Sequence, residues 1–315
     1  MSKIGTIEGF ALINEAKQSS RAGLLYAICG FALLSSGDAV VKTMADEWPA
    51  VAVAALRFTV GAVGLSIFLL IKEGRSSFLP TNPWLQIARG TCLTIASLAF
   101  FSAIYIMPLA ETMAIAFLAP ILTILLSGPI LGERIRPAVW VVCLGALVGV
   151  ALILRPNIAE LGWPAILPLI SALFFSFMMI ANRASAGQGS ALSMQVFIAA
   201  IASPLLILAA TAANLFEVPG MQFGIPDWSV VARCILVAIT ASGAHWLVYI
   251  GTMKAGASQV APAVYVQMLV AVVLGWWWFG DVPDNMTLIG AGAIIAAGLY
   301  LWRDSSTDPE HEKTI

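Results

Sequence analysis

The sequence contains very little charge. Only 10% of its 315 residues are Asp, Glu, Lys or Arg, whereas 60% are hydrophobic. A soluble domain is about a quarter charged and about half apolar, so a water-facing globule could not bury the apolar side chains of this chain. The scarcity of charge therefore favours an integral membrane protein. The net charge of −1 gives no reason to expect a nucleic-acid partner.

The sequence also lacks the motifs of metal, disulfide and nucleotide sites. There is no CxxC pair, no His at ligand spacing from a Cys, and no HExxH, GxSxG or GxxxxGK[ST]. The four cysteines lie within apolar runs, which is typical of small packing residues. They are Cys29, Cys92, Cys143 and Cys234.

Long apolar runs dominate what is present. A helix that crosses a bilayer needs about 20 mostly apolar residues, and ten segments qualify. They connect through short loops rich in Pro and Gly, the longest of which is 213–227. The predicted spans are 22–42, 50–71, 86–106, 109–131, 137–154, 163–182, 190–212, 228–251, 257–279 and 287–302.

The distribution of Lys and Arg predicts the orientation of these spans. If the N-terminus is cytoplasmic, twelve Lys and Arg residues fall at the inner side and only Lys42, Arg155 and Arg233 at the outer side. We therefore expect both termini in the cytoplasm and the protein in the inner (plasma) membrane.

Two of the spans mark an internal repeat. The run at 109–131 ends at Gly132-Glu133, and the run at 257–279 ends at Gly280-Asp281. Each half has five spans, an odd number, so the second half enters the membrane in the opposite direction. The sequence predicts an all-α integral membrane protein with ten transmembrane helices as a 5+5 inverted repeat.

The repeat also suggests how the chain is divided. Residues 1–20 form a cytoplasmic segment that could be a short interfacial helix or a disordered tail. The other parts are a first repeat at 21–155, a second repeat at 156–303 and a disordered cytoplasmic tail at 304–315.

The fourth span of each half carries a family resemblance. It is entered by a small-residue step, Leu109-Ala110 or Ala257-Ser258, and it ends at Gly-Glu or Gly-Asp. On these features residues 21–303 resemble the drug/metabolite transporter superfamily, in its EamA branch with two such domains. Gly37–Lys42, Leu56–Phe58 and Pro108–Glu111 further resemble a subgroup that includes S-adenosylmethionine and riboflavin carriers.

This resemblance implies a substrate pocket between the halves, alternating access and no bound cofactor. It does not imply one substrate, because relatives carry amino acids, nucleotide-like compounds, metallophores or drugs. The second half has Gly280-Asp281 where Gly-Glu is commoner. Since Asp keeps the negative charge, this departure changes little.

Ionisable residues inside a span are candidate site residues, because an unpaired charge in a bilayer is unfavourable. Asp38 and Lys42 lie four residues apart on one helix face, and Arg57 lies within the second span. Asp38 could pair with Lys42 or Arg57 to hold helices together. Alternatively, Asp38 could titrate or bind a cationic group, and Arg57 could bind a carboxylate or phosphate.

Aromatic and polar residues in the eighth and ninth spans add further candidates. His245 and Tyr249 share a face beside Trp246, so this group could stack on a flat ligand and sense protons. Tyr265 and Gln267 are two residues apart, so only one of them can face a pocket. Simple packing and interhelical hydrogen bonding are the alternatives for all five residues.

The fourth span contributes an acid and a small-residue face. Glu111 stands at the start of the helix, where it could interact with the helix dipole or act as a gate or proton site. The face contains Thr123, and its small residues permit either close helix packing or a wet cavity wall. Its members are Thr112, Ala116, Pro120, Thr123 and Ser127.

The most concrete function that follows is secondary active transport of a small polar or amphipathic metabolite, such as an amino-acid derivative or a cofactor-like compound. Protons or a counter-substrate would drive it, and the lipid bilayer is its other partner. Gly145 and Gly149 also permit a homodimer. The alternatives are a membrane enzyme that modifies lipids and a channel or scaffold without turnover.

Overall fold

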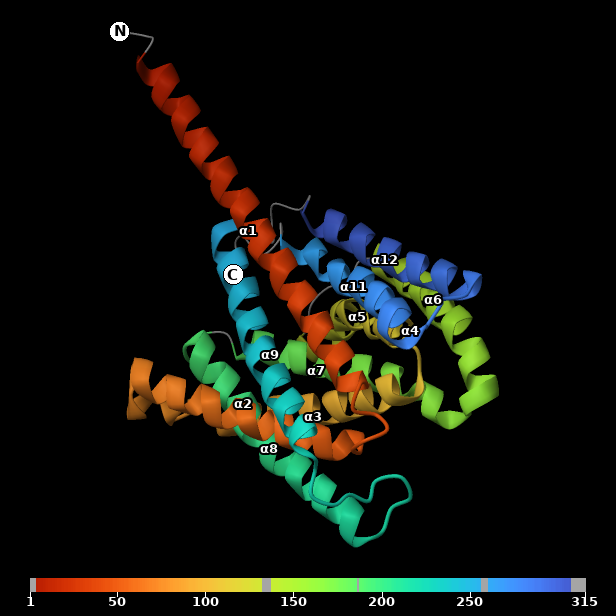
Figure 1. Ribbon diagram of the computed structural model, residues 1–315. Helices are drawn as coiled ribbons and strands as arrows, with labels where there is room; N and C mark the ends of the chain where they lie inside the picture. Colours follow the sequence, from red (N-terminus) through yellow and green to blue (C-terminus); the bar gives the residue numbers. More distant parts are fainter. Residues whose placement is uncertain (1–3, 132–136, 186, 256–259, 307–315) are drawn as a thin grey trace.

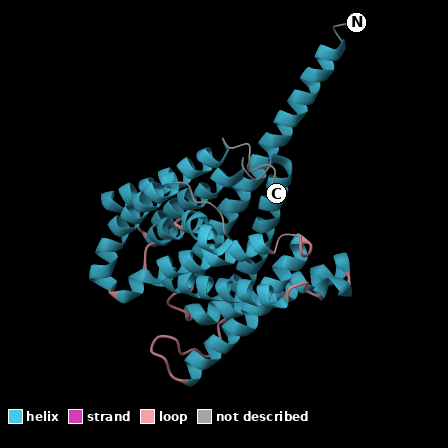
Figure 2. Ribbon diagram, turned by 180° about the vertical axis from the view of Figure 1, so that it is seen from behind, coloured by secondary structure: helices cyan, strands magenta, loops and turns pink. Residues whose placement is uncertain are grey.

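The computed structural model describes residues 4–131, 137–185, 187–255 and 260–306. Every regular element in these ranges is a helix (Figure 2), in agreement with the predicted all-α class. The helices are α1 (Ile4–Lys42), α2 (Ala50–Glu73), α3 (Pro83–Ile106), α4 (Leu109–Ala116), α5 (Ala119–Leu131), α6 (Pro137–Leu161), α7 (Leu167–Ala184), α8 (Ala191–Leu215), α9 (Trp228–Ala255), α11 (Val266–Leu274) and α12 (Asn285–Ser306). The short elements are η1 (Arg75–Phe78), η2 (Trp163–Ile166), η3 (Ala261–Tyr265) and the π-helical η4 (Gly275–Phe279).

Seven helical segments of the described chain are long and apolar enough to cross a membrane. They correspond to the first four predicted spans and to the sixth, seventh and eighth. The remaining three predicted spans contain shorter apolar helices at Val142–Leu154, Ala263–Phe279 and Asn285–Tyr300.

The N-terminal segment belongs to the first helix. α1 begins at Ile4 and extends well beyond the bundle before it packs on other helices (Figure 1). No proline interrupts residues 4–42, so nothing in the sequence stops the helix from continuing through the polar stretch. At the other terminus α12 reaches Ser306, beyond the predicted helix end, and residues 307–315 lie outside the described residues.

Polar side chains define where several helices begin. The Leu85 amide donates to Asn82 Oδ1 at 3.2 Å before α3, and the Ser193 amide donates to Ser190 Oγ at 3.0 Å before α8. The first amides of a helix have no partner in the helix itself, so such acceptors stabilise the helix start.

The fourth span of each half is interrupted near its middle. In the first half, α4 ends at Ala116 and α5 begins at Ala119, one residue before Pro120. Pro120 has no amide hydrogen to donate to the carbonyl four residues earlier, so it favours a break at this point. In the second half, the 3₁₀ turn η3 gives way to α11 after Tyr265. Interrupted helices expose backbone groups that a carrier site can use.

Helices from the two halves pack against each other in matching pairs. α1 packs along α9, and α3 packs along α7. α2 also packs on α8, α6 packs on α12, and α1 and α7 contact α11 and α5 respectively. Each pair joins the first half to the second half, so the two halves share one interface (Figure 1).

Glycines allow the closest of these approaches. A Cβ at Gly23 of α1 would lie 2.8 Å from the Gly251 carbonyl oxygen of α9, and a Cβ at Gly149 of α6 would lie 2.7 Å from the Gly290 carbonyl oxygen of α12. Gly149 therefore packs against another helix of the same chain. Of the two glycines that suggested a homodimer, Gly145 is exposed and has no neighbouring atom within 4 Å of a Cβ placed there.

The loops gather at two ends of the bundle. At what we call the Lys42 end, Trp48 Nε1 donates to the Gly224 carbonyl at 3.3 Å, and Arg233 pairs with Glu47. At the opposite end, which we call the Glu73 end, Ser190 Oγ donates to Glu73 Oε2 at 2.8 Å. Both ends thus carry contacts between the two halves.

Candidate functional site

One polar stripe of α1 faces the second half. Ser35, Asp38 and Lys42 recur at helical spacing, so they lie on the same side of α1. Ser35 Oγ donates to the Gln267 carbonyl at 2.8 Å, and Lys42 reaches Asp281. Asp38 lies between these two contacts, about 6 Å along the helix from Lys42 at 1.5 Å per residue.

Lys42 is paired with Asp281 of the second half. Its Nζ lies 2.8 Å from Asp281 Oδ2 and 2.9 Å from the Met107 carbonyl oxygen, and it stands 4.9 Å from the centroid of the Phe279 ring. Both charged side chains are largely buried. Because Lys42 is the last residue of α1, its side chain extends past the helix end toward Asp281, which follows η4. The pairing of Lys42 with Asp38 considered from the sequence is therefore not the one that forms.

Arg57 of α2 is held between two aromatic rings. Its guanidinium carbon lies 5.0 Å from the centroid of Phe58 and 5.0 Å from that of Phe101 on α3. Arg57 and Asp38 interact electrostatically. They form no direct ion pair within 4 Å, however, since the ion pairs found between described side chains are Lys42–Asp281 and Arg233–Glu47.

Two residues of α9 also interact electrostatically with Arg57. These are Cys234, which is fully buried, and His245, which is exposed. We call Arg57 and the three residues that interact with it electrostatically, Asp38, Cys234 and His245, the charged cluster. Its members come from α1, α2 and α9, so it lies where the two halves meet. No group of three metal-ligating side chains occurs among the residues that the structure describes.

The aromatic neighbours of His245 are exposed. Trp246 is 56% exposed, and it shares an outward stripe of α9 with Ile239 and Met253, which are 64% and 69% exposed. Tyr249 is half exposed, and its ring centroid lies 6.1 Å from that of Trp246. Exposed apolar side chains on one helix face suit contact with lipid.

The structure separates the roles of Tyr265 and Gln267. The Tyr265 ring contacts the Phe117 ring edge-on at 5.7 Å, and its hydroxyl fills the space where a Cβ of Gly298 would stand. The Tyr265 side chain thus lies between Phe117, which follows α4, and Gly298 of α12. The Gln267 side chain is partly exposed, while its carbonyl accepts the bond from Ser35.

Glu111 and Thr123 contact neighbouring backbone and helices. Glu111 is buried in the first turn of α4, and Glu111 Oε1 accepts a hydrogen bond from Thr287 Oγ1 of α12 at 3.2 Å. Thr123 Oγ1 donates to the Ala119 carbonyl of its own helix at 2.8 Å. Glu111 thus joins the start of α4 to α12, and the Thr123 hydroxyl bonds within its own helix.

A buried arginine near the Glu73 end was missed as a candidate. Arg89 of α3 is only 4% exposed; its Nε donates to Asn182 Oδ1 of α7 at 2.6 Å, and it also pairs with Gln86. The signal was available, because Arg89 lies inside the predicted span 86–106.

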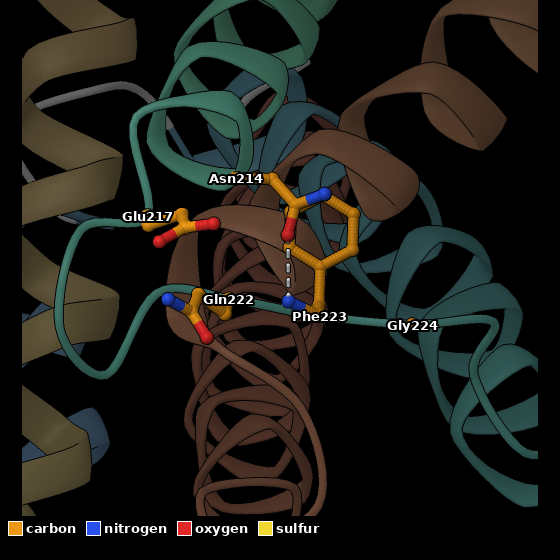
Figure 3. A pocket seen from close by; sticks show the side chains of 5 residues that line it. All are labelled: Asn214, Glu217, Gln222, Phe223 and Gly224. Atoms are coloured by element: carbon orange, nitrogen blue, oxygen red, sulfur yellow. Dashed lines mark hydrogen bonds between the residues drawn. The ribbon is translucent and has the colours of Figure 1, made fainter.

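A hollow lies elsewhere, in the loop after α8. Its volume is about 430 Å³, and Figure 3 shows the residues that line it. The Phe223 amide donates to Asn214 Oδ1 at 3.0 Å across its wall. The lining residues are Asn214, Glu217, Gln222, Phe223 and Gly224. This hollow is formed by one loop and does not reach the charged cluster.

Comparisons with known proteins agree with the architecture. The chain is 24% identical to an S-adenosylmethionine uptake transporter of Rickettsia prowazekii over 92% of its own length and 95% of that protein. It is 24% identical to a riboflavin transporter of Rhizobium johnstonii (76% of each chain) and 25% identical to a pseudopaline exporter of Pseudomonas aeruginosa (90% and 96%). A crystal structure with 21% identity superposes with a TM-score of 0.59 and covers 91% of this chain and 99% of that one.

The profile of the EamA-like transporter family matches residues 21–155 and 162–303, so it covers both halves. The relatives are transporters, which points away from the enzyme alternative. The apolar helices are those of a multi-pass membrane protein. The chain therefore belongs to the EamA-like transporter family, within the drug/metabolite transporter superfamily.

Proposed function

We propose that this protein is a secondary active transporter that moves a small polar or amphipathic metabolite across the plasma membrane by alternating access. Its ten spans would form two five-helix halves of opposite orientation, with the substrate site between them. The observation that supports this best is that each half makes an equivalent contact to the other half. An inverted repeat of this kind is typical of carriers.

Two hydrogen bonds illustrate these equivalent contacts. Ser35 in the first span of the first half donates to the Gln267 carbonyl in the fourth span of the second half. Ser176 in the first span of the second half donates to the Ala119 carbonyl in the fourth span of the first half, at 3.0 Å. Ala119 and Gln267 are separated in sequence by the same number of residues as Gly132 and Gly280. A two-fold axis in the membrane plane accounts for both bonds.

The fourth spans meet on that proposed axis. Phe117 and Tyr265 have the same separation in sequence, and their rings contact each other. They also mark the helix interruptions between α4 and α5 and between η3 and α11. Helix breaks that meet at the centre of the bundle supply a hinge, about which the transporter can close at one side of the membrane and open at the other.

The charged cluster is the proposed transport site. It joins helices of both halves, and Asp38, Arg57 and His245 all keep accessible surface. The ion pair between Lys42 and Asp281 lies about one helical turn further toward the Lys42 end and would close the site on that side. Transport would require this pair to separate and the Glu73 end to close.

Either a proton gradient or exchange of substrates would drive the cycle. The sequence has no GxxxxGK[ST] loop for nucleotide hydrolysis. Asp38 and His245 are the groups of the charged cluster that could carry a proton. Lys42 belongs to the gate in this proposal, and Gln267 is a further candidate for substrate contact.

The test is uptake of radiolabelled metabolites into proteoliposomes that contain the purified protein. The panel should include amino acids, nucleosides, flavins and sulfonium compounds, with and without a pH gradient and with preloaded unlabelled substrate. We expect saturable uptake of at least one compound, absent from protein-free liposomes. If no compound shows saturable flux under any of these conditions, the proposal is wrong.

A further inference from the structure

Arg57 has donors that no protein acceptor takes. The guanidinium carries five N–H groups, yet no hydrogen bond or direct ion pair of its side chain occurs among the described residues. Its known contacts are the faces of Phe58 and Phe101 and the electrostatic attraction of Asp38. A partly exposed arginine with free donors inside a helix bundle is suited to bind an anionic group of a ligand.

The two rings restrict how that group can bind. Phe101 is 2% exposed and sits in the core of the bundle, so its position is fixed by packing. A guanidinium stacked on aromatic faces is held by cation–π attraction, while its edge stays free to donate. The edge presents two parallel donors, which match the two oxygens of a carboxylate.

Asp38 supplies the opposite charge close by. Its carboxylate accepts no hydrogen bond from any described residue, and it is partly exposed. Lys42, the nearest cation on the same helix, is already paired with Asp281. Asp38 and Arg57 therefore attract each other electrostatically without forming a direct ion pair.

The charge balance of Asp38 and Arg57 selects among ligands. One Asp and one Arg sum to zero, so a ligand with no net charge leaves the site neutral. An anion or a cation would leave an unbalanced charge among apolar helices, which is strongly unfavourable. A zwitterion of matching length satisfies both side chains and keeps the balance.

We propose that the site recognises small zwitterions, with Arg57 oriented by Phe58 and Phe101 to bind a carboxylate and Asp38 to bind a cationic group of the same molecule. The inference rests on the proposed transport function. It makes Arg57 and Asp38 substrate-binding residues and makes Phe58 and Phe101 positioning residues.

The test compares zwitterions with their two half-molecules. Purified protein in lipid nanodiscs is titrated with L-leucine, isoamylamine and 4-methylpentanoate, and with L-phenylalanine, phenethylamine and 3-phenylpropanoate. Affinity is read by calorimetry and by competition in the uptake assay. We expect at least one zwitterion to bind about tenfold or more tightly than either half-molecule, the factor that corresponds to about 1.4 kcal/mol.

Charge variants then distinguish recognition from a structural role. Asp38→Asn should weaken the zwitterion and strengthen the carboxylic acid, whereas Arg57→Gln should favour the amine. Arg57→Lys keeps the charge but loses the fork and the stacking, so it should weaken the zwitterion about tenfold or more. Phe101→Leu should lower the preference for the zwitterion over the amine, while Phe174→Leu on α7 serves as the matched control.

The outcomes separate the two proposals. If a compound of another class is transported and the charge variants lower all affinities alike, zwitterion recognition is wrong and transport stands. If no compound of any class is transported, the proposed function itself is wrong. Preference for the zwitterion that inverts in Asp38→Asn and Arg57→Gln supports both proposals.

Discussion

At the scale of single residues, the ion pair between Lys42 and Asp281 is the most specific contact between the halves. Each partner also binds the backbone beside α4, through the Met107 carbonyl and the Leu109 amide. The pair therefore ties the end of α1 to the start of α4 and to the end of η4. Removal of one partner leaves the other charge largely buried and uncompensated.

We predict that Lys42→Met opens the Lys42 end more often. The reporter is Cys234, which is fully buried, in a background in which the other three cysteines are serine. Labelling by a membrane-impermeant maleimide should become about tenfold faster if the pair contributes about 1.4 kcal/mol to closure. Asp281→Asn should speed the labelling of Cys234 in the same way, whereas the control Lys72→Met should leave it unchanged. If Lys42→Met and the unchanged protein are labelled at the same rate, the ion pair between Lys42 and Asp281 is not a gate.

The pair of Glu47 and Arg233 predicts a pH effect at the loops of the same end. A hydrogen bond from Arg233 lowers the pKa of Glu47 below its ordinary value of 4.5. The folded pKa is thus below the unfolded pKa, so the pair stabilises the fold fully above the ordinary value of 4.5 and loses its effect as the pH falls through the folded value.

Glu47→Gln should accordingly lower the melting temperature at pH 7 and have no effect well below pH 4, a range set by the ordinary Glu pKa. Both side chains are partly exposed, with 23% and 40% of their surface accessible, so the change is expected to stay below about 1 kcal/mol. Thermal unfolding in detergent at both pH values measures it, with Glu160→Gln as control. A difference that persists unchanged at low pH would refute the pairing.

At the scale of helices, the packing of α1 on α9 depends on small residues. A Cβ at Gly30 would lie 2.8 Å from the Ala244 carbonyl oxygen and 2.8 Å from Val248 Cγ2. Such contacts are too short for carbon, so either the backbones or the side chains must separate. Gly64 on α2 is exposed, and a Cβ there meets no atom within 4 Å.

We therefore expect Gly30→Ala to destabilise the protein by about 1–3 kcal/mol, the usual range for overpacking. Gly64→Ala should be neutral or slightly stabilising, because alanine favours the helix by up to about 1 kcal/mol. Melting temperatures of the two purified variants measure the difference. Equal stability of both variants would mean that α1 and α9 do not pack this closely.

At the scale of the whole molecule, the two ends of the bundle should lie on opposite sides of the membrane. The distribution of Lys and Arg predicts that the Lys42 end is outside and that both termini are cytoplasmic. Ser76 in η1 and Gln222 in the loop after α8 are exposed residues at opposite ends.

Single cysteines at these two positions in a cysteine-free chain test that orientation. A membrane-impermeant thiol reagent added to intact cells should label Gln222→Cys and should not label Ser76→Cys until the cells are opened. Labelling of both sites after lysis is the control for reactivity. The reverse pattern in intact cells would place the termini outside.

The sequence predicted much of the fold and supplied candidate residues for the proposed site. Long apolar runs must become helices in a bilayer, because backbone hydrogen bonds have no other partner there. The starts of α2 and α9 at Ala50 and Trp228 therefore coincide with the predicted starts. Asp38 and Arg57 were recognisable as candidates, because a charge within an apolar run is rare whatever its neighbours.

The rotation of each helix was not predictable in the same way. These helices are apolar on nearly every side, so their periodicity does not tell which face meets protein and which meets lipid. For this reason His245 and Trp246 were grouped from the sequence, although one lies near Arg57 and the other on the exposed stripe of α9.

By itself, the sequence determined that the chain is a helical membrane protein with two related halves, because apolar length and repeated motifs are local properties. The tertiary structure alone decided that Lys42 pairs with Asp281 rather than Asp38, and that Phe101 holds Arg57. These partners lie on different helices, far apart in the chain. Which of them meet depends on how the helices turn and pack, and no local pattern encodes that geometry.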